Sequence, residues 1–213
     1  MAANPNLVVK HGLDSIIREI HSWMMDAVPV DKSIAERVRA LRAEHGLTLD
    51  ELAERSGVSR AMISRIERAE ASPTAALLAR LCEALGITLS SFFADVTEAS
   101  SPLRRRDEQR LWRDPHTGYV RRSVSPPGMP SRVDIVAVEF PPGARVSFPP
   151  RPESRSMTQH VWLLEGELQM KIAGTVHRLQ AGDCLFMDLG DAFDFYNPGK
   201  GAAKYAVILD RGR

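Results

Sequence analysis

The spacing of apolar residues changes near the middle of the chain. In the N-terminal half, apolar residues recur three and four positions apart and glycines punctuate the segments, which predicts short amphipathic helices. In the C-terminal half, stretches such as VDIVAVEF alternate between apolar and polar residues, and turn sequences such as DPHTG and NPGKG separate them. This alternation predicts strands with one buried face. We therefore expect an α+β protein with an all-α N-terminal part and an all-β C-terminal part.

The same pattern divides the chain into four segments. We expect a helical extension at residues 1–32, a helical domain at 33–95, a polar linker at 96–102 and a β-rich domain at 103–213. The extension contains LDSIIREIHSWMMDA, whose apolar residues fall on one face of a helix and need an apolar partner. That partner is either the neighbouring domain or the same helix of a second subunit; alternatively, translation starts at Met24 or Met25.

The helical domain carries signals for five short helices. Ser33 with Glu36, and Thr48 with Glu51, have the spacing of a capping box, in which two side chains satisfy free backbone N–H groups at a helix start. Ser59 is placed to cap the third helix. Two further helices are predicted within SPTAALLARLCEALG and TLSSFF.

A sharp turn at Gly57 joins the second and third predicted helices. Ala53 lies four residues before this glycine, and Ile63 and Ile66 lie six and nine residues after it. Helices that cross closely need a small side chain at the crossing and apolar side chains at the packing positions. Residues 33–95 resemble the lambda-repressor-like helix-turn-helix domain of the XRE family of transcriptional regulators, and the resemblance spans all five helices.

The resemblance implies that the third helix enters the major groove of double-stranded DNA. We expect Arg60 to contact a guanine, the commonest specific pairing of arginine, and Arg65 to contact a base or a phosphate. Backbone N–H groups at the starts of the second and third helices are expected to meet phosphates. The predicted DNA-contacting residues are Thr48, Ser59, Arg60, Ala61, Ser64, Arg65 and Arg68.

Two further expectations concern the arrangement of this domain. Arg42 and Glu67 match positions that form a structural ion pair in the family, and we expect them to hold the third helix at its angle. One recognition helix reads too few bases alone, so we expect a two-fold homodimer on an inverted-repeat operator.

The β-rich domain resembles the small β-barrel cupin domain. The resemblance rests on LLEGEL and on LQAGDCLFM followed by NPG, and it covers residues 103–213. A metal-binding cupin presents two histidines, a glutamate and a third histidine; the matching positions here hold Glu153, Arg155, Gln159 and Phe193. His160 is adjacent to one of these positions but faces the other side of its strand. We therefore expect no metal, no cofactor and no catalytic residue.

The alternation in the strands predicts what lines the barrel instead. Inward-facing positions are apolar or aromatic, which fits two hypotheses: a filled core, or an apolar pocket for a small-molecule effector with Gln159 and Arg155 as polar anchors. The residues expected to line such a pocket are Arg155, Gln159, Val161, Met170, Met187, Phe193 and Phe195.

Composition narrows the class of protein. The net charge is +1 over 213 residues, so a DNA-binding surface must arise from local arrangement rather than from a global basic field. Cys82 and Cys184 lie in no CxxC pair and are expected to be small buried hydrophobic residues. No apolar run is long enough to cross a membrane, and no signal-like stretch lies near Met1, so we expect a cytoplasmic protein without membrane association.

Three functions are compatible with these features. The favoured hypothesis is a sequence-specific DNA-binding regulator whose metal-free cupin senses a small molecule or dimerises. The second hypothesis is an enzyme, because some proteins of this architecture resemble iron-dependent epoxidases or dioxygenases. That chemistry needs a facial metal site of histidine and carboxylate ligands, and the absence of these ligands disfavours it. The third possibility is a cupin that serves only as a dimerisation module.

Overall fold

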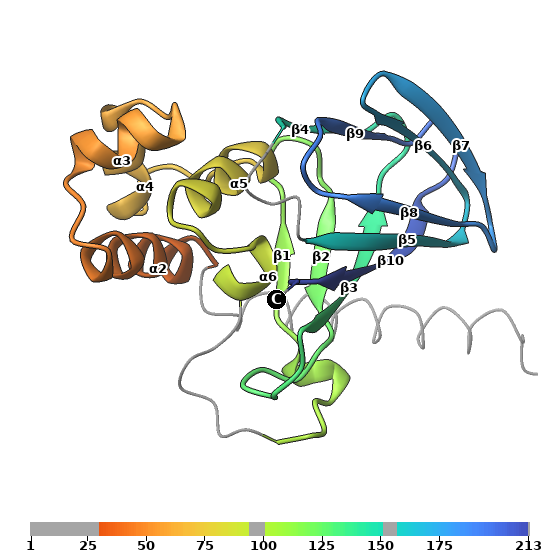
Figure 1. The fold of residues 1–213 in the computed structure, drawn as a ribbon, viewed down its shortest axis with the longest axis horizontal. Helices are drawn as coiled ribbons and strands as arrows, with labels where there is room; N and C mark the ends of the chain where they lie inside the picture. The colour runs from red at the N-terminus through yellow and green to blue at the C-terminus, as the bar shows by residue number, and fades with distance from the viewer. Residues whose placement is uncertain (1–29, 94–100, 151–156, 213) are drawn as a thin grey trace, which may run out of the picture.

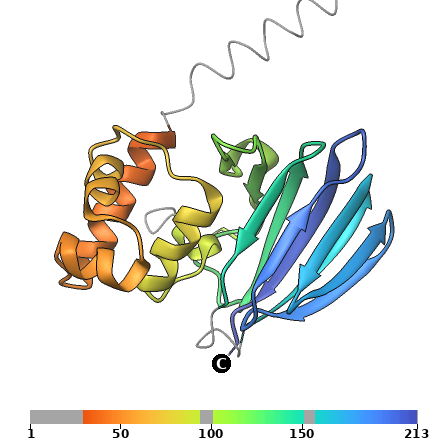
Figure 2. The same cartoon turned by 90° about the horizontal axis from the view of Figure 1, so that it is seen from above.

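The computed structural model describes residues 30–93, 101–150 and 157–212. Helices gather on one side of the molecule and strands on the other, as Figures 1 and 2 show, and α5 and α6 lie nearest the strands. The predicted α+β layout is therefore present. The helices are α2 (Val30–Glu44), α3 (Leu49–Ser56), α4 (Arg60–Glu67), α5 (Ala75–Ala84) and α6 (Leu89–Phe92).

The strands form two antiparallel sheets that face each other across the barrel interior. The larger sheet has the order β1-β2-β3-β10-β5-β8 and the smaller has the order β4-β9-β6-β7. A short 3-10 helix, η1 (Arg106–Glu108), precedes the first strand. The strands are β1 (Leu111–Arg113), β2 (Val120–Ser123), β3 (Val133–Phe140), β4 (Arg145–Phe148), β5 (Thr158–Glu165), β6 (Glu167–Ile172), β7 (Thr175–Gln180), β8 (Cys184–Asp188), β9 (Phe193–Tyr196) and β10 (Ala203–Asp210).

Side-chain caps define most helix starts. Thr48 and Glu51 form the expected capping box, and Ser59 caps α4 by accepting a hydrogen bond from the Met62 N–H. The other expected box does not mark a helix start: α2 begins at Val30, so Ser33 lies inside its first turn. The prediction of a helix start at Ser33 was therefore wrong, because the helical backbone includes the preceding residues Val30, Asp31 and Lys32.

The helical and β-rich parts meet at an aspartate in the first β-turn. Asp114 is 1% exposed, and its Oδ2 accepts a 2.5 Å hydrogen bond from the Ala75 N–H at the start of α5. Its Oδ1 accepts from the backbone N–H groups of His116 and Thr117 at 2.7 and 2.9 Å. A carboxylate at a helix start satisfies a free donor and interacts favourably with the helix dipole. One carboxylate thus shapes its own turn and caps a helix of the other part.

The expectation for the two cysteines is half correct. Cys82 is buried in α5, whereas Cys184 is exposed at the start of β8. The burial pattern of β8 places Cys184 and Phe186 on the outer face of the sheet and Met187 inside. The expected extension and linker fall largely on residues 1–29 and 94–100, and Arg155 falls on 151–156; these lie outside the described residues.

Candidate DNA-binding surface and barrel cavity

Helix α4 presents one face to the core and the other to solvent. Ile63 and Ile66 are fully buried against α2 and α3, with Val58 beside them. The opposite face exposes Arg60, Ala61, Arg65 and Arg68, and Ser64 is half-buried. The structure therefore brings the predicted side chains of the recognition helix onto one accessible face.

A bidentate ion pair ties α4 to α2. Arg42 Nε and Nη2 donate to the two carboxylate oxygens of Glu67 at 2.6 and 2.9 Å, and Arg42 Nη1 donates to the Leu47 carbonyl at 2.8 Å. The Glu67 side chain is only 7% exposed. The hydrogen bond to Glu67 raises the pKa of Arg42. These are the two residues that the sequence assigns to a structural pair, and Arg39 also donates to the main-chain carbonyl of Glu67.

The exposed charges on this surface pair locally. Arg60 Nε lies 3.1 Å from Asp50 Oδ1 of α3, and both side chains are more than 60% exposed, at 63% and 76%. Arg68 donates to both carboxylate oxygens of Glu70 at 2.7 and 2.8 Å, and to the Ser64 hydroxyl. The hydrogen bond from Arg68 lowers the pKa of Glu70. Because such exposed pairs contribute little free energy, either arginine can exchange its carboxylate for a phosphate or a base.

The two helix starts differ in their suitability for phosphate. At Thr48, the Glu51 carboxylate accepts hydrogen bonds from the backbone N–H and the hydroxyl at 2.7 and 2.8 Å. These bonds lower the pKa of Glu51, so the start of α3 already holds a negative charge. The first turn of α4 contains no acidic residue. Ser59 is therefore better placed than Thr48 to meet a phosphate, a distinction that the spacing alone does not reveal.

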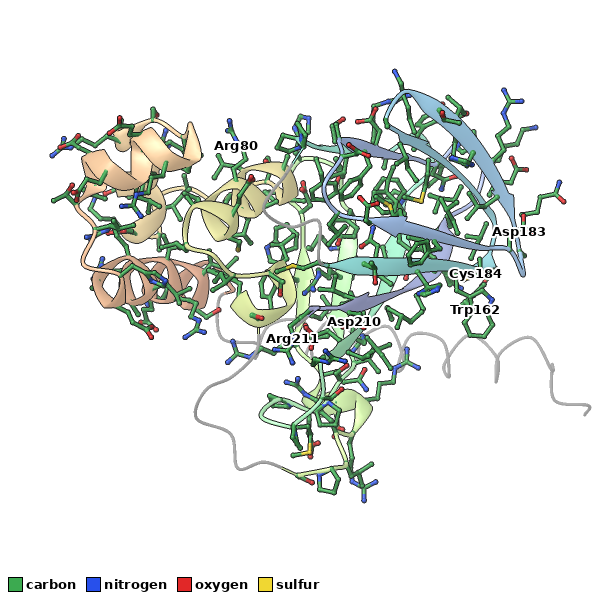
Figure 3. All side chains as sticks on the ribbon, in the orientation of Figure 1. Arg80, Trp162, Asp183, Cys184, Asp210 and Arg211 are labelled. Carbon is green, nitrogen blue, oxygen red and sulfur yellow. The ribbon has the colours of Figure 1, made fainter. Side chains whose placement is uncertain are left out.

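Sequence reasoning did not single out Arg80, which contacts the turn between α3 and α4. Its Nη1 donates to the carbonyl of Gly57, the residue that ends α3 in a left-handed conformation, at 3.4 Å. Figure 3 labels it on the helical part, above α5. The position depends on α5 packing against α3, and no local motif signals that contact.

A cavity of about 240 Å³ lies at the end of the barrel that faces the helices. The α5–α6 segment forms one part of its wall, and strands β2, β3, β4, β5, β9 and β10, with residues that adjoin strands β2, β5 and β8, form the other part. No residue of β6 or β7 lines it. The lining residues are Glu83, Gly86, Ile87, Thr88, Leu89, Tyr119, Arg121, Val136, Val138, Phe140, Val146, Phe148, Met157, Gln159, Leu189, Phe193, Phe195, Tyr205, Val207 and Leu209.

The residues predicted for a pocket divide into two groups. Gln159, Phe193 and Phe195 line the cavity, with Phe193 stacked on Phe148 at a centroid distance of 4.9 Å. The other three described candidates are buried but do not line it; they are Val161, Met170 and Met187. Alternation along a strand predicts the inward face, but not the depth at which the interior changes from open to filled.

The cavity wall does not fit a metal ion. Its lining residues, as far as the structure describes them, include no histidine, cysteine or aspartate, and their one carboxylate, Glu83, comes from α5. At the predicted ligand positions, Phe193 offers no donor, and Gln159 Nε2 donates to Met187 Sδ at 3.2 Å. His160 is exposed, with its ring 5.1 Å from that of Phe186. Throughout residues 30–93, 101–150 and 157–212, no three metal-ligating side chains cluster.

The cavity also holds a buried arginine that sequence reasoning missed. Arg121 is 5% exposed; its guanidinium carbon lies 5.2 Å from the centre of the Phe93 ring, and Nη1 donates to the Ser123 hydroxyl at 3.3 Å. Burial lowers the pKa of Arg121 and raises that of the neighbouring Tyr119 to about 12. The strand register accounts for this position, because Arg121 pairs with Trp112 and with Val138, both buried, and no local pattern in the sequence signals that register.

Comparison with known proteins agrees with these two parts. Residues 38–92 match the family model "Helix-turn-helix", and residues 136–209 match the "Cupin domain" model. The HTH-type transcriptional regulator SutR of Escherichia coli is 26% identical over 150 residues, covering 70% of this chain and 79% of SutR. The uncharacterized HTH-type transcriptional regulator y4dJ of Sinorhizobium fredii is 39% identical over 57 residues, covering 27% of this chain and 74% of y4dJ.

A solved structure extends the likeness to both parts. The HTH_3 family transcriptional regulator from Vibrio cholerae superposes with a TM-score of 0.70 at 24% identity, covering 86% of this chain and 97% of that chain. In the described part of the chain, no helix combines the length and apolar character needed to cross a bilayer. The chain belongs to the XRE-type helix-turn-helix transcriptional regulators, DNA-binding proteins that here carry a C-terminal cupin domain.

Proposed function

We propose that this regulator changes its affinity for an operator when a small molecule occupies the barrel cavity. One observation carries the proposal: the cavity wall is built jointly by the α5–α6 segment and by the strands. An occupant would therefore contact both the DNA-binding part and the barrel. A ligand shifts an equilibrium only through its different affinity for two arrangements, and a shared wall supplies such a difference.

Operator contact is assigned to α4 and its neighbours. Arg60 and Arg65 reach base edges or phosphates, Ala61 contacts a thymine methyl group, and the α4 start at Ser59 meets a phosphate. Ser64 and Arg68 contribute once Arg68 leaves Glu70. Thr48 contributes least, because the Glu51 carboxylate already occupies its donors. What supports the assignment is the shared exposed face of these residues.

Arginine truncation tests this assignment. We expect Arg60→Ala and Arg65→Ala each to weaken operator binding by about 1–3 kcal/mol with the fold intact. The operator is first selected from a random DNA duplex pool, and affinities are measured by fluorescence anisotropy at fixed salt. Arg178→Ala, at an exposed position of β7, serves as the matched control. Unchanged affinity in both α4 variants would remove the assignment.

The outer face of the larger sheet supports a homodimer. Two adjacent rows of paired residues cross β3, β10, β5 and β8 and are mostly apolar, with Trp162 47% and Phe186 58% exposed. Figure 3 labels Trp162 and Cys184, which are direct cross-strand partners. The rows are Ile135, Ile208, His160, Phe186 and Ala137, Ala206, Trp162, Cys184. Patches of this kind mark interaction sites, and a second copy of the chain is the occupant we propose.

A two-fold dimer would place two copies of α4 on an inverted repeat, with half-sites roughly 34 Å apart or a multiple of that. We expect Trp162→Glu to give a monomer by light scattering, and Val176→Glu, an exposed position on β7 of the smaller sheet, to leave the dimer intact. A wild-type monomer, both free and on DNA, would overturn the dimer proposal.

Filling the cavity tests the effector proposal. Val136→Phe adds a ring to the cavity wall at a core cost of about 1–3 kcal/mol. Small molecules that raise the Tm of the wild-type protein should shift its operator affinity, and the same molecules should have no effect on Val136→Phe. Effectors that act equally on both proteins would place the site elsewhere. A wild-type protein that responds to none would leave the cupin as a dimerisation module.

A further inference from the structure

We propose that the cavity takes a small monocarboxylic acid with an apolar, preferably aromatic, body, and that Arg121 binds its carboxylate. The inference rests on the proposed effector function of the cavity and adds the chemical class of the ligand. It follows from three properties of the described wall: its buried arginine, its aromatic surface and its size.

Within residues 30–93, 101–150 and 157–212, Arg121 is the only cationic side chain that lines the cavity. A guanidinium stays charged at physiological pH and presents parallel N–H donors that match a carboxylate in bidentate geometry. At 5% exposure the charge is poorly solvated, so an anion beside it gains more than it would in water. The nearby Asp134 carboxylate favours the charged form of Arg121, and a bound carboxylate would add to that stabilisation.

The rest of the wall favours an apolar body with a ring. Phe193 and Phe195 meet edge to face at 5.8 Å, and Phe195 stacks on Tyr205 at 5.6 Å. Such faces bind a further ring by stacking or edge contacts. An engineered cavity of about 150 Å³ binds benzene. A cavity of about 240 Å³ therefore has room for a ring with a short acidic side chain.

The charge balance favours a monoanion over a phosphate ester. Among the lining residues that the structure describes, the charged side chains are one arginine, Arg121, and one carboxylate, Glu83. A phosphate dianion would need several more cationic or N–H donors, whereas the remaining polar groups on the wall are the Gln159 amide and hydroxyl groups such as that of Tyr205.

The position of Arg121 connects ligand binding to the helical part. Its guanidinium lies over Phe93, directly after α6, and Phe93 is in turn 5.6 Å from the Trp112 ring of β1. A carboxylate that draws the guanidinium toward the cavity would alter its contact with Phe93. Carboxylate binding would thus act at the junction between the DNA-binding part and the barrel.

The wild-type protein allows a direct test with a matched pair of probes. We expect 3-phenylpropionate to bind at least tenfold more tightly than 3-phenylpropionamide, measured by isothermal titration calorimetry on the full chain. The two probes share ring, length and shape and differ in charge. Equal affinities, or tighter binding of the amide, would overturn the assignment of a carboxylate.

Two arginine variants test whether Arg121 causes the preference for the acid over the amide. Arg121→Met removes the charge while keeping an apolar side chain, and we expect it to abolish the preference for the acid. Arg122→Met, the next residue and only partly buried, is the control and should keep the preference. A preference that persists in Arg121→Met would exclude Arg121 as the anchor. If Arg121→Met does not fold, Arg121→Lys, which keeps the charge without the bidentate fork, should show a reduced preference, and an undiminished one would exclude the anchor.

A third variant separates the two proposals. In Val136→Phe, both probes should lose binding because both occupy the cavity. If acid and amide bind the wild-type cavity equally and both shift operator affinity, the effector pocket stands and the carboxylate assignment falls. If Val136→Phe binds both probes as the wild type does, the cavity is not their site and both proposals fall.

Discussion

The outer face of α4 and the wall of the barrel cavity handle charge in opposite ways. On α4, arginines are exposed and paired with nearby carboxylates, as in Arg60 with Asp50 and Arg68 with Glu70. In the cavity wall, Arg121 is buried and lies beside aromatic rings. Exposed pairs exchange partners at little cost, which suits a surface that must bind and leave a polyanion. A buried cation cannot exchange freely, which suits selection of one ligand class.

A second comparison concerns packing within the barrel: side chains fill one end, and the cavity lies at the other. Leu163 is fully buried and does not line the cavity, whereas Phe193 borders it. We expect Leu163→Ala to cost about 3–5 kcal/mol of unfolding free energy, because it creates a void in a filled region. Phe193→Ala should cost closer to about 2 kcal/mol despite removing more atoms, since part of that ring already faces open space.

Urea denaturation of both variants measures this difference. The two variants should have the same m-value as the wild type, so that the midpoints report stability alone. A Phe193→Ala variant less stable than Leu163→Ala would show that the cavity end is filled as tightly as the other end.

Two glutamates allow a buried and an exposed ion pair of the helical part to be compared. Glu67→Ala leaves Arg42 without its bidentate partner in a largely buried site and should cost roughly 3 kcal/mol. Glu70→Ala removes an equally short pair with Arg68 that is half exposed, and stability should not change measurably. Thermal unfolding followed by circular dichroism compares them. Equal losses would mean that burial does not decide the strength of these pairs.

Features set by local spacing could be predicted from the sequence. The capping box at Thr48 and Glu51 and the cap at Ser59 depend on residues three apart. The alternation in β5 likewise predicts that Gln159 faces inward, and Gln159 is 6% exposed. These features need no knowledge of distant segments, because one turn of helix or one pleat of strand determines them.

Features that need several distant segments could not be predicted. The inward position of Arg121 follows from the register of β2 between β1 and β3, and charge alone favours the opposite face. The side chains of Val161 and Met170 face the barrel interior, as the alternation predicts, but they are buried at the filled end and do not line the cavity. The joint wall of the cavity depends on how the α5–α6 segment meets the barrel, where Asp114 caps α5, and no local pattern contains that information.

At alkaline pH, the unfolding free energy should depend on a buried tyrosine of the cavity wall. Burial raises the pKa of Tyr119 to about 12 from its ordinary value of 10.0. Between these values the unfolded chain loses the phenol proton and the folded chain keeps it, so the unfolding free energy falls as pH rises from about 10 to about 12. The total loss from this residue is roughly 3 kcal/mol. Burial also raises the pKa of Tyr205, so Tyr119→Phe should make this limb of a stability–pH curve shallower without removing it, and an unchanged limb would contradict the assignment.

The smallest expected effect concerns the carboxylate that holds Arg60. Asp50 lies in the first turn of α3 and pairs with Arg60 at 3.1 Å, so it competes with DNA for the guanidinium. Asp50→Asn should raise operator affinity by up to about fivefold, which corresponds to the ~1 kcal/mol upper range of an exposed ion pair. It should lower stability slightly, because an acidic side chain at a helix start interacts favourably with the helix dipole.

Salt dependence and a matched control decide whether this small effect is specific. The gain from Asp50→Asn should shrink as ionic strength rises, because exposed charges are screened. Asp191→Asn removes an exposed carboxylate from the barrel and changes the net charge equally, but should not alter operator affinity. If both variants gain equally, the gain reflects net charge and Arg60 is not released by the substitution. If only Asp50→Asn gains, and the gain disappears in the double variant with Arg60→Ala, then Arg60 exchanges a protein carboxylate for DNA, as the exposed face of α4 requires.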